Sequence, residues 1–328
     1  MKTGSINLTR KHEITLAPTA PFNFDATFHK PDYFPTPDNH WEPGTKWHTM
    51  LWQGTHLGLR LQNEGTVARP RLRLVVWAAK QLRRDFIASV AQELSYRFNL
   101  QLDLADFNKR FGRDAQLGPV IRKWRGMRPM SDSSLYEAIM IMIVLQNCTV
   151  RRTVSMMRAL FENYGRLLAF DRKELYCYWP PSVIDRVSEE ELRALKVGYR
   201  AKSIKRVTRS FAGDGFDELA LRTKPQEEQR KALLSLYGIG PASVDYMLFG
   251  LFHHWNALGH ISPWEQKIYS KLFFDANPDR PVSVPKLLAL FDKRYGEYKM
   301  LAVHYIWEDL FWQRKEGGIP WLDELIRL

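Results

Sequence analysis

Cysteine is scarce in this sequence. Its 328 residues include two cysteines, Cys148 and Cys177, too few for a disulfide framework or for an iron–sulfur cluster held by four cysteines of one chain. The nine histidines show no metal-ligand spacing, and the adjacent pair His253 and His254 cannot share one face of a helix. These absences argue against a metal-dependent nuclease, and we expect no metal site built from side chains.

Long apolar runs are also missing. The longest, residues 138–145, is too short to span a membrane and is interpreted as a buried helix. The first residues contain no hydrophobic segment of the signal-peptide type. We therefore expect an intracellular protein without a membrane partner. The chain contains no internal repeat and no low-complexity linker.

Positive charge, in contrast, is in excess. The chain has 48 lysines and arginines against 36 aspartates and glutamates, which gives a formal net charge of +12. This balance favours a polyanionic partner through phosphate contacts and counterion release, and nucleic acid is the natural candidate. With 45% hydrophobic and 26% charged residues, the composition is that of a globular protein, and the length predicts two or three domains.

The basic residues gather in three groups, each beside a glycine-containing or polar turn. They are Arg122, Lys123, Arg125 and Arg128; Arg151, Arg152 and Arg158; and Arg200, Lys202, Lys205, Arg206 and Arg209. Two interpretations are open, a phosphate-binding surface or the solvated faces of helices. The clustering favours phosphate binding.

The sequence pattern changes near residue 80. Short strand-like runs such as 46–52 and 72–77 predict a small antiparallel sheet in residues 1–80. After that the pattern is helical almost without break, which predicts a mainly α protein with a small N-terminal antiparallel β-domain. Helices are expected over 85–98, 135–145, 150–164 up to Gly165, 188–198 from a Ser188 capping box, 241–251, 283–291 and 301–311. We divide the chain into the β-domain at 1–80, connecting helices at 81–132, a helical subdomain at 133–225 and a last helical part at 226–328.

A Gly-x-Gly turn joins two predicted helices in the last part. The first helix opens at Lys224-Pro225, with proline in its first turn. Gly238 lies where the end of that helix needs a positive φ, and Gly240 begins the next helix. The exposed amides at the start of the second helix predict an anion site that a phosphate can approach closely. The alternative is an ordinary helix turn, because Gly-x-Gly alone is a weak signal.

Four segments in order resemble the helix-hairpin-helix DNA glycosylase superfamily, which contains 3-methyladenine DNA glycosylase II and 8-oxoguanine DNA glycosylase. They are Leu135 to Thr149, Leu195-Lys196-Val197-Gly198-Tyr199-Arg200-Ala201, the Gly-x-Gly hairpin with Pro263-Trp264-Glu265, and His304 to Trp312. The resemblance implies an active-site cleft between two helical subdomains. It also implies a DNA-repair enzyme of base excision repair that flips a damaged base out of double-stranded DNA. We expect a monomer associated with DNA, in the nucleoid or cytoplasm of a prokaryote or the nucleus of a eukaryote.

The resemblance places the catalytic carboxylate at Glu265. An N-glycosidic bond breaks through an oxocarbenium-like sugar, which a nearby carboxylate stabilises, or the carboxylate positions a water. The superfamily has aspartate in this Pro-x-Asp segment, so glutamate adds roughly 1.5 Å of reach, and a misplacement of about 1 Å can cost on the order of 100-fold in rate. A working Glu265 and a disabled site both remain open. Asp245 is a rival carboxylate for which we expect a structural role.

A second departure concerns the nucleophile. The bifunctional 8-oxoguanine enzymes carry a lysine two residues after the second hairpin glycine, where this chain has Ala242. Without that amine no Schiff base can form at this position, so we expect a monofunctional hydrolase without lyase activity that leaves an abasic site. Lys267 and Lys271 are expected to contact phosphate or to lie on the surface.

The resemblance also implies the residues that grip the duplex. In the hairpin these are Gly238, Gly240, Ala242 and Ser243. The backbone carbonyls of Tyr237 and Ile239 are candidates to hold a structural sodium or potassium ion, and no organic cofactor is expected.

By this resemblance, residues 135–149 form the helix and loop that present a wedge residue to the duplex, within the 133–225 subdomain. Asn147 lies at the wedge position. Arg152 and Arg200 match the two arginines that 8-oxoguanine enzymes turn towards the cytosine left behind, and Tyr199 supports them. This interpretation makes the lesion a guanine product. The alternative makes the arginines helix-surface charges and Asn147 a helix cap.

The substrate class is a damaged purine, either alkylated or an oxidised guanine. Electron-poor alkylated bases are held by stacking, whereas 8-oxoguanine demands specific hydrogen bonds. Four aromatic residues are candidates for a stacking pocket or, equally, for core packing: Trp264, Tyr246, Trp307 and Trp312. A contrasting hypothesis is a catalytically impaired protein that binds lesions with the same hairpin grip. Base release distinguishes the two.

Overall fold

The computed structural model describes residues 4–30, 36–213 and 216–325, which form two compact units. The first unit comprises Met1–Leu104 and Arg125–Asp217, and the second comprises Ala105–Trp124 and Glu218–Leu328. Each unit is thus assembled from two separate pieces of the chain. The four-part division of the sequence stays a prediction.

The first unit contains a five-stranded antiparallel sheet, as the sequence predicted. Its spatial order is β2-β6-β5-β4-β3. The strands are β2 (Arg10–Leu16), β3 (Asn39–Glu42), β4 (Thr45–Trp52), β5 (Thr55–Asn63) and β6 (Leu72–Ala78). The predicted runs 46–52 and 72–77 correspond to β4 and β6, which confirms the small antiparallel sheet.

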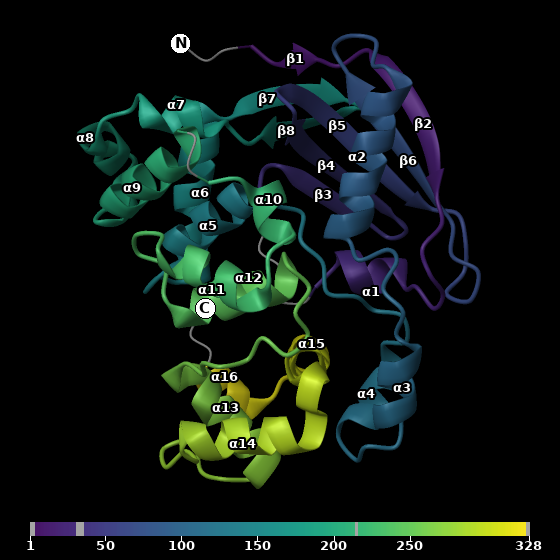
Figure 1. Cartoon of the computed structure of the whole chain (residues 1–328), viewed down its shortest axis with the longest axis vertical. Helices are drawn as coiled ribbons and strands as arrows, with labels where there is room; N and C mark the ends of the chain where they lie inside the picture. Colours follow the sequence, from purple (N-terminus) through teal and green to yellow (C-terminus); the bar gives the residue numbers. More distant parts are fainter. Residues whose placement is uncertain (1–3, 31–35, 214–215, 326–328) are drawn as a thin grey trace. The chain divides into compact units, whose positions relative to one another are not determined.

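Both faces of this sheet are buried. On one face, alternate residues such as Leu57, Leu59 and Leu61 form a core with the helices α1 (Phe24–Phe28) and α2 (Arg84–Arg97). Figure 1 shows α2 lying along the sheet. On the other face, Gly58 leaves room for the ring of Phe170, which a Cβ at that position would approach to 2.4 Å. The sheet therefore connects the N-terminal residues to the later helical part of the same unit.

Phe170 belongs to a second sheet, which contradicts the prediction of unbroken helix after residue 80. Its order is β1-β7-β8, with β1 (Ile6–Asn7), β7 (Arg166–Phe170) and β8 (Lys173–Cys177). Asp171 and Arg172 join β7 to β8 with φ of +45° and +60°, the geometry of a two-residue hairpin turn. This turn usually has an Asn-Gly or Asp-Gly sequence, so Asp-Arg gives only a weak signal, and five-residue apolar runs do not distinguish strand from helix.

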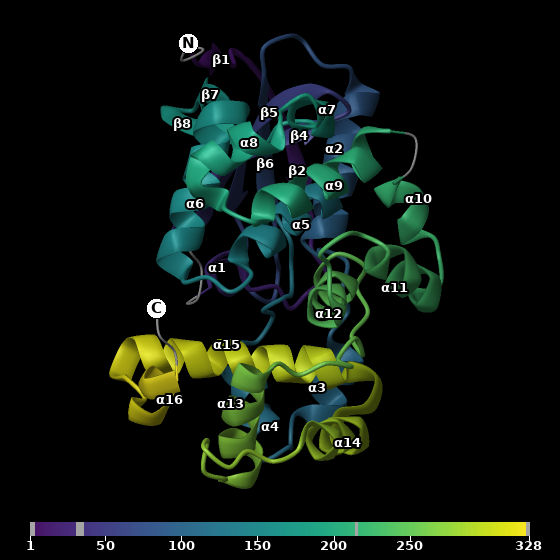
Figure 2. The same ribbon diagram turned by 90° about the vertical axis from the view of Figure 1, so that its left-hand side faces the viewer.

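The first unit also contains helices, among them α5 (Leu135–Leu145), most of whose residues are buried although Leu145 at its end is 39% exposed. The others are α6 (Val150–Tyr164), α7 (Pro181–Asp185), α8 (Glu189–Leu192), the π-helical turn η1 (Arg193–Val197) and α9 (Arg200–Ala212). Helix α5 packs against α6 and α9, as Figure 2 shows. The predicted helices at 135–145 and 150–164 are confirmed to the residue.

The second unit is helical throughout its described residues. Its helices are α3 (Ala105–Phe111), α4 (Leu117–Lys123), α10 (Glu218–Arg222), α11 (Gln226–Leu234), α12 (Pro241–Gly250), α13 (Pro263–Phe274), α14 (Val284–Tyr295), η2 (Gly296–Tyr298), α15 (Lys299–Gly317) and α16 (Pro320–Leu325). Helix α4 packs against α15, where Trp124 Nε1 donates to Asp309 Oδ1 at 2.7 Å. No described helix is long and apolar enough to cross a membrane.

Candidate active site and DNA interface

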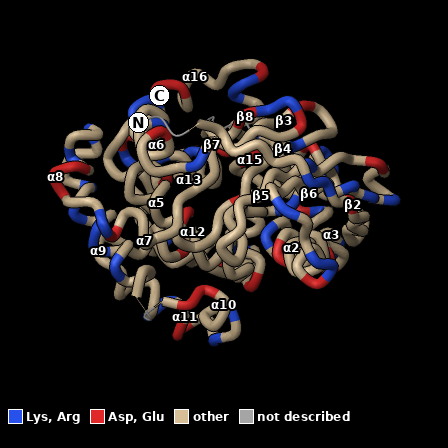
Figure 3. Tube along the Cα trace, turned by 90° about the horizontal axis from the view of Figure 1, so that it is seen from above, with Lys and Arg blue, Asp and Glu red and all other residues tan. Residues whose placement is uncertain are grey.

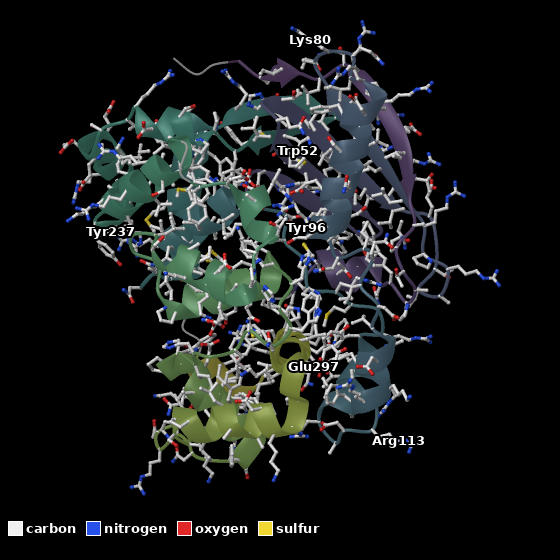
Figure 4. The ribbon with its side chains drawn as sticks, viewed as in Figure 1. Trp52, Lys80, Tyr96, Arg113, Tyr237 and Glu297 are labelled. Atoms are coloured by element: carbon white, nitrogen blue, oxygen red, sulfur yellow. The ribbon has the colours of Figure 1, made fainter. Side chains whose placement is uncertain are left out.

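The Gly-x-Gly turn forms the predicted hairpin between α11 and α12 within the second unit. Gly238 has φ of +81°, so the expected left-handed residue is confirmed. Gly240 is the N-cap of α12 and Pro241 its first residue, and no side chain caps the first amides. Tyr237 stands at the edge of the structure, 41% exposed (Figure 4). A helix N-terminus without a side-chain cap, preceded by glycine, has the features of an anion site.

The turn also carries the backbone carbonyls of Tyr237 and Ile239, one on each side of Gly238. The amide of Ile239 donates to Leu236 O at 3.2 Å, which closes the turn tightly. A monovalent cation at these carbonyls stays a prediction. The described part of the chain contains no group of three or more His, Cys, Asp or Glu residues placed to hold a metal ion.

Glu265 lies in the first turn of α13, where the local sequence holds it firmly. Ser262 is the N-cap, and its Oγ accepts from the Glu265 amide at 3.3 Å. The Ser262 amide donates in return to Glu265 Oε2 at 2.9 Å. This capping box uses the longer side chain of glutamate at the third helical position, which gives a physical reason for glutamate here in place of aspartate.

A tyrosine hydroxyl holds the other carboxylate oxygen. Tyr246 Oη, on α12, donates to Glu265 Oε1 at 2.7 Å. The glutamate is 6% exposed, whereas Tyr246 is 46% exposed and lies on its solvent side. Burial raises the pKa of Tyr269 well above its usual value, and the nearby Glu265 raises it further. Tyr269 therefore stays protonated.

Asp245 has the structural role that we expected. Its Oδ2 accepts from the amides of Gly259 and His260, at 2.8 and 2.9 Å, and its Oδ1 lies 2.8 Å from a guanidinium nitrogen of Arg230. The carboxylate is 2% exposed. It ties α11 and α12 to the loop that leads into α13, and so fixes the start of the helix that carries Glu265.

Ala242 is the second residue of α12 and offers only a methyl group at the position of the lysine nucleophile. Ser243 follows it in the same first turn. Of the two nearby lysines, Lys271 forms an ion pair with Asp275 on the surface of α13. The ion pair agrees with the surface role that we expected for Lys271.

The aromatic candidates divide into two sites. Trp264 is 37% exposed beside Glu265, and its ring meets that of Trp307 edge-on at 5.2 Å. Trp307 stacks in turn on Phe311 at 4.9 Å and belongs to the packed wall behind Trp264. Trp312 instead stacks on Trp124 at 5.7 Å, because it lies on a different face of α15 from Trp307. The exposed rings beside the carboxylate are thus Trp264 and Tyr246.

In the first unit, the predicted wedge loop links α5 to α6. Asn147 has φ of +48°, a left-handed conformation that asparagine tolerates better than most residues. Thr149 caps α6, since its Oγ1 accepts from the Arg152 amide at 3.3 Å, and Gln146 is the C-cap of α5. Asn147 therefore takes the left-handed position that follows the C-cap of α5, a position at which asparagine can end a helix, and its role as the wedge stays a prediction.

Arg200 holds this loop from below. Its Nη2 donates to the backbone carbonyl of Gln146, and its guanidinium lies 4.7 Å from the ring of Tyr199. Arg200 is 3% exposed and so is not a helix-surface charge, while Tyr199 is 54% exposed. Arg152 is exposed in the first turn of α6. The structure thus brings Asn147, Tyr199 and Arg200 together around one carbonyl.

The sequence analysis missed two participants in these contacts. The Gln146 carbonyl belongs to the backbone, so no side-chain pattern marks it. Ser262 had a readable signal, because Ser-x-x-Glu at 262–265 has the same spacing as the capping box recognised at Ser188.

One of the three basic groups is partly withdrawn from the surface. Arg128 is fully buried and donates to the backbone carbonyls of Asn99, Leu102, Thr19 and Pro21, so it is unavailable to a phosphate. Lys123 pairs with Asp309, and Arg122 donates to Gly112 O at 2.9 Å. These two side chains and that of Arg125 are exposed. Figure 3 shows the group that remains most prominent, the lysines and arginines along α9.

The sequence and the structure were compared with those of known proteins. No protein-family model matches the sequence. A protein of Methanothermobacter thermautotrophicus described as a probable N-glycosylase/DNA lyase is 24% identical over 295 residues, which cover 84% of this chain and 88% of the relative. The 3-methyladenine DNA-glycosylase of Archaeoglobus fulgidus aligns with a TM-score of 0.73 at 16% identity, over 93% of this chain and 100% of that one.

A further solved structure is the 8-oxoguanine glycosylase/lyase of Clostridium acetobutylicum in complex with double-stranded DNA containing cytosine opposite 8-oxoguanine. It aligns with a TM-score of 0.69 at 18% identity, over 96% of this chain and 100% of that one. The relatives and structural neighbours are helix-hairpin-helix DNA glycosylases, which confirms the resemblance and the fold class predicted from the sequence.

Proposed function

We propose that this chain, whose relatives and structural neighbours are DNA glycosylases, is a monofunctional DNA glycosylase that removes a damaged purine from double-stranded DNA by hydrolysis. The observation that carries the proposal is the carboxylate of Glu265. It is held at both oxygens, on the same unit as the hairpin, beside the exposed rings of Tyr246 and Trp264.

The proposed chemistry needs a fixed negative charge. As the bond between sugar and base breaks, positive charge grows on the sugar, and a preorganised carboxylate stabilises it without reorganising solvent. Glu265 then also orients the water that attacks the anomeric carbon, and the leaving base departs with the bonding electron pair. Because Ala242 provides no amine, water is the nucleophile and the product is an abasic site.

The proposed substrate is an alkylated purine or an oxidised guanine. Arg152, exposed in the first turn of α6, favours cytosine as the partner base, whereas the exposed rings of Tyr246 and Trp264 favour stacking on an electron-poor base. Arg200 is 3% exposed and donates to the Gln146 carbonyl, so it supports the wedge loop and does not read the base directly. The protein acts as a monomer on damaged duplex DNA without an organic cofactor. Carbonyls of Tyr237 and Ile239 would hold a sodium or potassium ion that steadies the hairpin against phosphate.

A second candidate is a lesion-binding protein without catalysis. It is favoured by the burial of Glu265, because both of its oxygens already accept hydrogen bonds from Tyr246 and Ser262. In that case the glutamate serves only as a capping residue. The two candidates agree on DNA binding and differ on base release.

The test is single-turnover base release by the wild type and by the Glu265→Gln variant. Duplexes carry one 8-oxoguanine, 7-methylguanine, 3-methyladenine analogue, hypoxanthine or uracil opposite cytosine or thymine. We expect release that requires hot alkali for strand scission and falls at least about 100-fold in the variant, because the amide cannot stabilise the sugar cation.

The chain offers a matched control in Glu191→Gln. Glu191 occupies the same capping-box position at α8, with Ser188 N donating to its Oε2 at 2.7 Å. We expect this variant to keep the wild-type rate. Equal losses in both variants would reduce the role of Glu265 to helix capping, and a wild type that binds damaged duplexes but releases no base supports the lesion-binding candidate.

A further inference from the structure

The bond between Tyr246 and Glu265 joins two elements that are separate in the sequence. The donor is on α12 and the acceptor on α13, and 19 positions separate them. At 2.7 Å, the O–H···O contact has the length of a charge-assisted hydrogen bond. The bond from the Ser262 amide to Oε2 follows from the local sequence, whereas the bond from Tyr246 to Oε1 depends on the packing of α12 and α13.

Helix α12 is a stiff support for this donor. Gly240 caps its first turn, and Tyr246 lies about 8 Å further along the axis. The residue before it, Asp245, binds the Gly259 and His260 amides and so fixes the loop that enters α13. Helix α12 thus begins at the hairpin and carries Tyr246, the donor to Glu265. Through Asp245 it also fixes the loop that leads into α13, the helix that carries Glu265.

We propose that Tyr246 is a positioning residue, whose hydroxyl keeps the Glu265 carboxylate turned to one orientation for its role at the sugar. This inference rests on the proposed function. A carboxylate held at both oxygens loses little rotational freedom in the transition state, so its alignment does not have to be established during the reaction.

The test is Tyr246→Phe, which keeps the ring and removes only the hydroxyl. We expect the single-turnover rate of base release to fall about tenfold or more, because the carboxylate loses one of the donors that align it, while the affinity for damaged duplex stays within twofold. In a Glu265→Gln background the same change should have no further effect on the rate.

Tyr298→Phe is the matched control, since Tyr298 Oη donates to Asp106 Oδ2 at 3.0 Å elsewhere in the same unit. It should leave rate and affinity unchanged. If the wild type is active and Tyr246→Phe keeps its rate, the inference fails and the proposed function stands. A wild type that releases no base from any duplex overturns both.

Discussion

Three Ser-x-x-Glu capping boxes begin helices of this protein, at Ser134, Ser188 and Ser262. At the third, the glutamate side chain also accepts a bond from a tyrosine hydroxyl, and a half-exposed tryptophan stands beside it. A motif that normally stabilises a helix end by about 1 kcal/mol thereby also fixes a buried carboxylate in one orientation. Helix capping and the proposed catalysis both require Glu265 in this one orientation.

A residue-scale prediction concerns Ala242. The Ala242→Lys variant places an amine at the position where bifunctional relatives carry their nucleophile, on a partly exposed turn that can accept the longer side chain. We expect borohydride to trap a covalent complex of this variant with damaged duplex, and none with the parent protein. Trapping of the parent would contradict the monofunctional proposal.

At the scale of elements, the segment between α8 and α9 shows how backbone geometry serves the wedge loop. Within the π-helical turn η1, Lys196 has φ of +64°, and the C-cap Gly198 has φ of +64° and ψ of −137°. This conformation is close to glycine-only, and it redirects the chain so that Arg200 can reach the Gln146 carbonyl. The irregular segment, more than the regular helices, determines where Arg200 lies.

Gly198→Ala tests this interpretation. A Cβ at Gly198 meets no atom within 4 Å, so any cost comes from the backbone alone, and we expect the free energy of unfolding to fall by about 1–3 kcal/mol. Urea denaturation measures it. Gly213→Ala at the other end of α9 is the control, because its φ of −91° suits alanine and it should change stability little. Equal effects at both glycines would argue against a conformational origin.

At the scale of the whole molecule, stability should depend on a buried ionisable group beside the five-stranded sheet. Burial raises the pKa of Asp38 from 3.8 to about 6, and the nearby Asp132 raises it further. The folded protein therefore holds a proton that the unfolded chain releases between pH 4 and 6, so this group destabilises the fold as pH rises through that window. Burial lowers the pKa of the neighbouring His48 to about 4, which has the opposite effect over a similar range.

Asp38→Asn isolates the first of these effects. The amide cannot ionise, so we expect the variant to be more stable than the wild type at pH 7 by up to roughly 3 kcal/mol, and equally stable below pH 4. Denaturation at pH 4, 5, 6 and 7 follows the difference. A difference that is constant with pH would show that it arises from packing instead of ionisation.

Much of the molecule follows from local sequence. The boundaries of α5 and α6, the left-handed Gly238 and the missing amine at Ala242 are each decided within a few residues, by caps, periodicity and side-chain chemistry. The β7–β8 hairpin was missed because local sequence does not decide it. Its turn has the sequence Asp-Arg, which is a weak signal, and its strands are stabilised by packing against the larger sheet.

The sequence by itself determined where the hairpin lies, which residue is the candidate carboxylate and that no lysine stands at the nucleophile position. Only the tertiary structure decided that Tyr246 holds Glu265, that Arg200 supports the wedge loop from within, and that Arg128 is buried among carbonyls and unavailable to a phosphate. The physical reason is the separation along the chain between the residues that interact. A cap or a turn is stabilised by neighbours along the chain, whereas these three contacts join residues 19, 54 and 29 positions apart, and their energies exist only once the elements have packed.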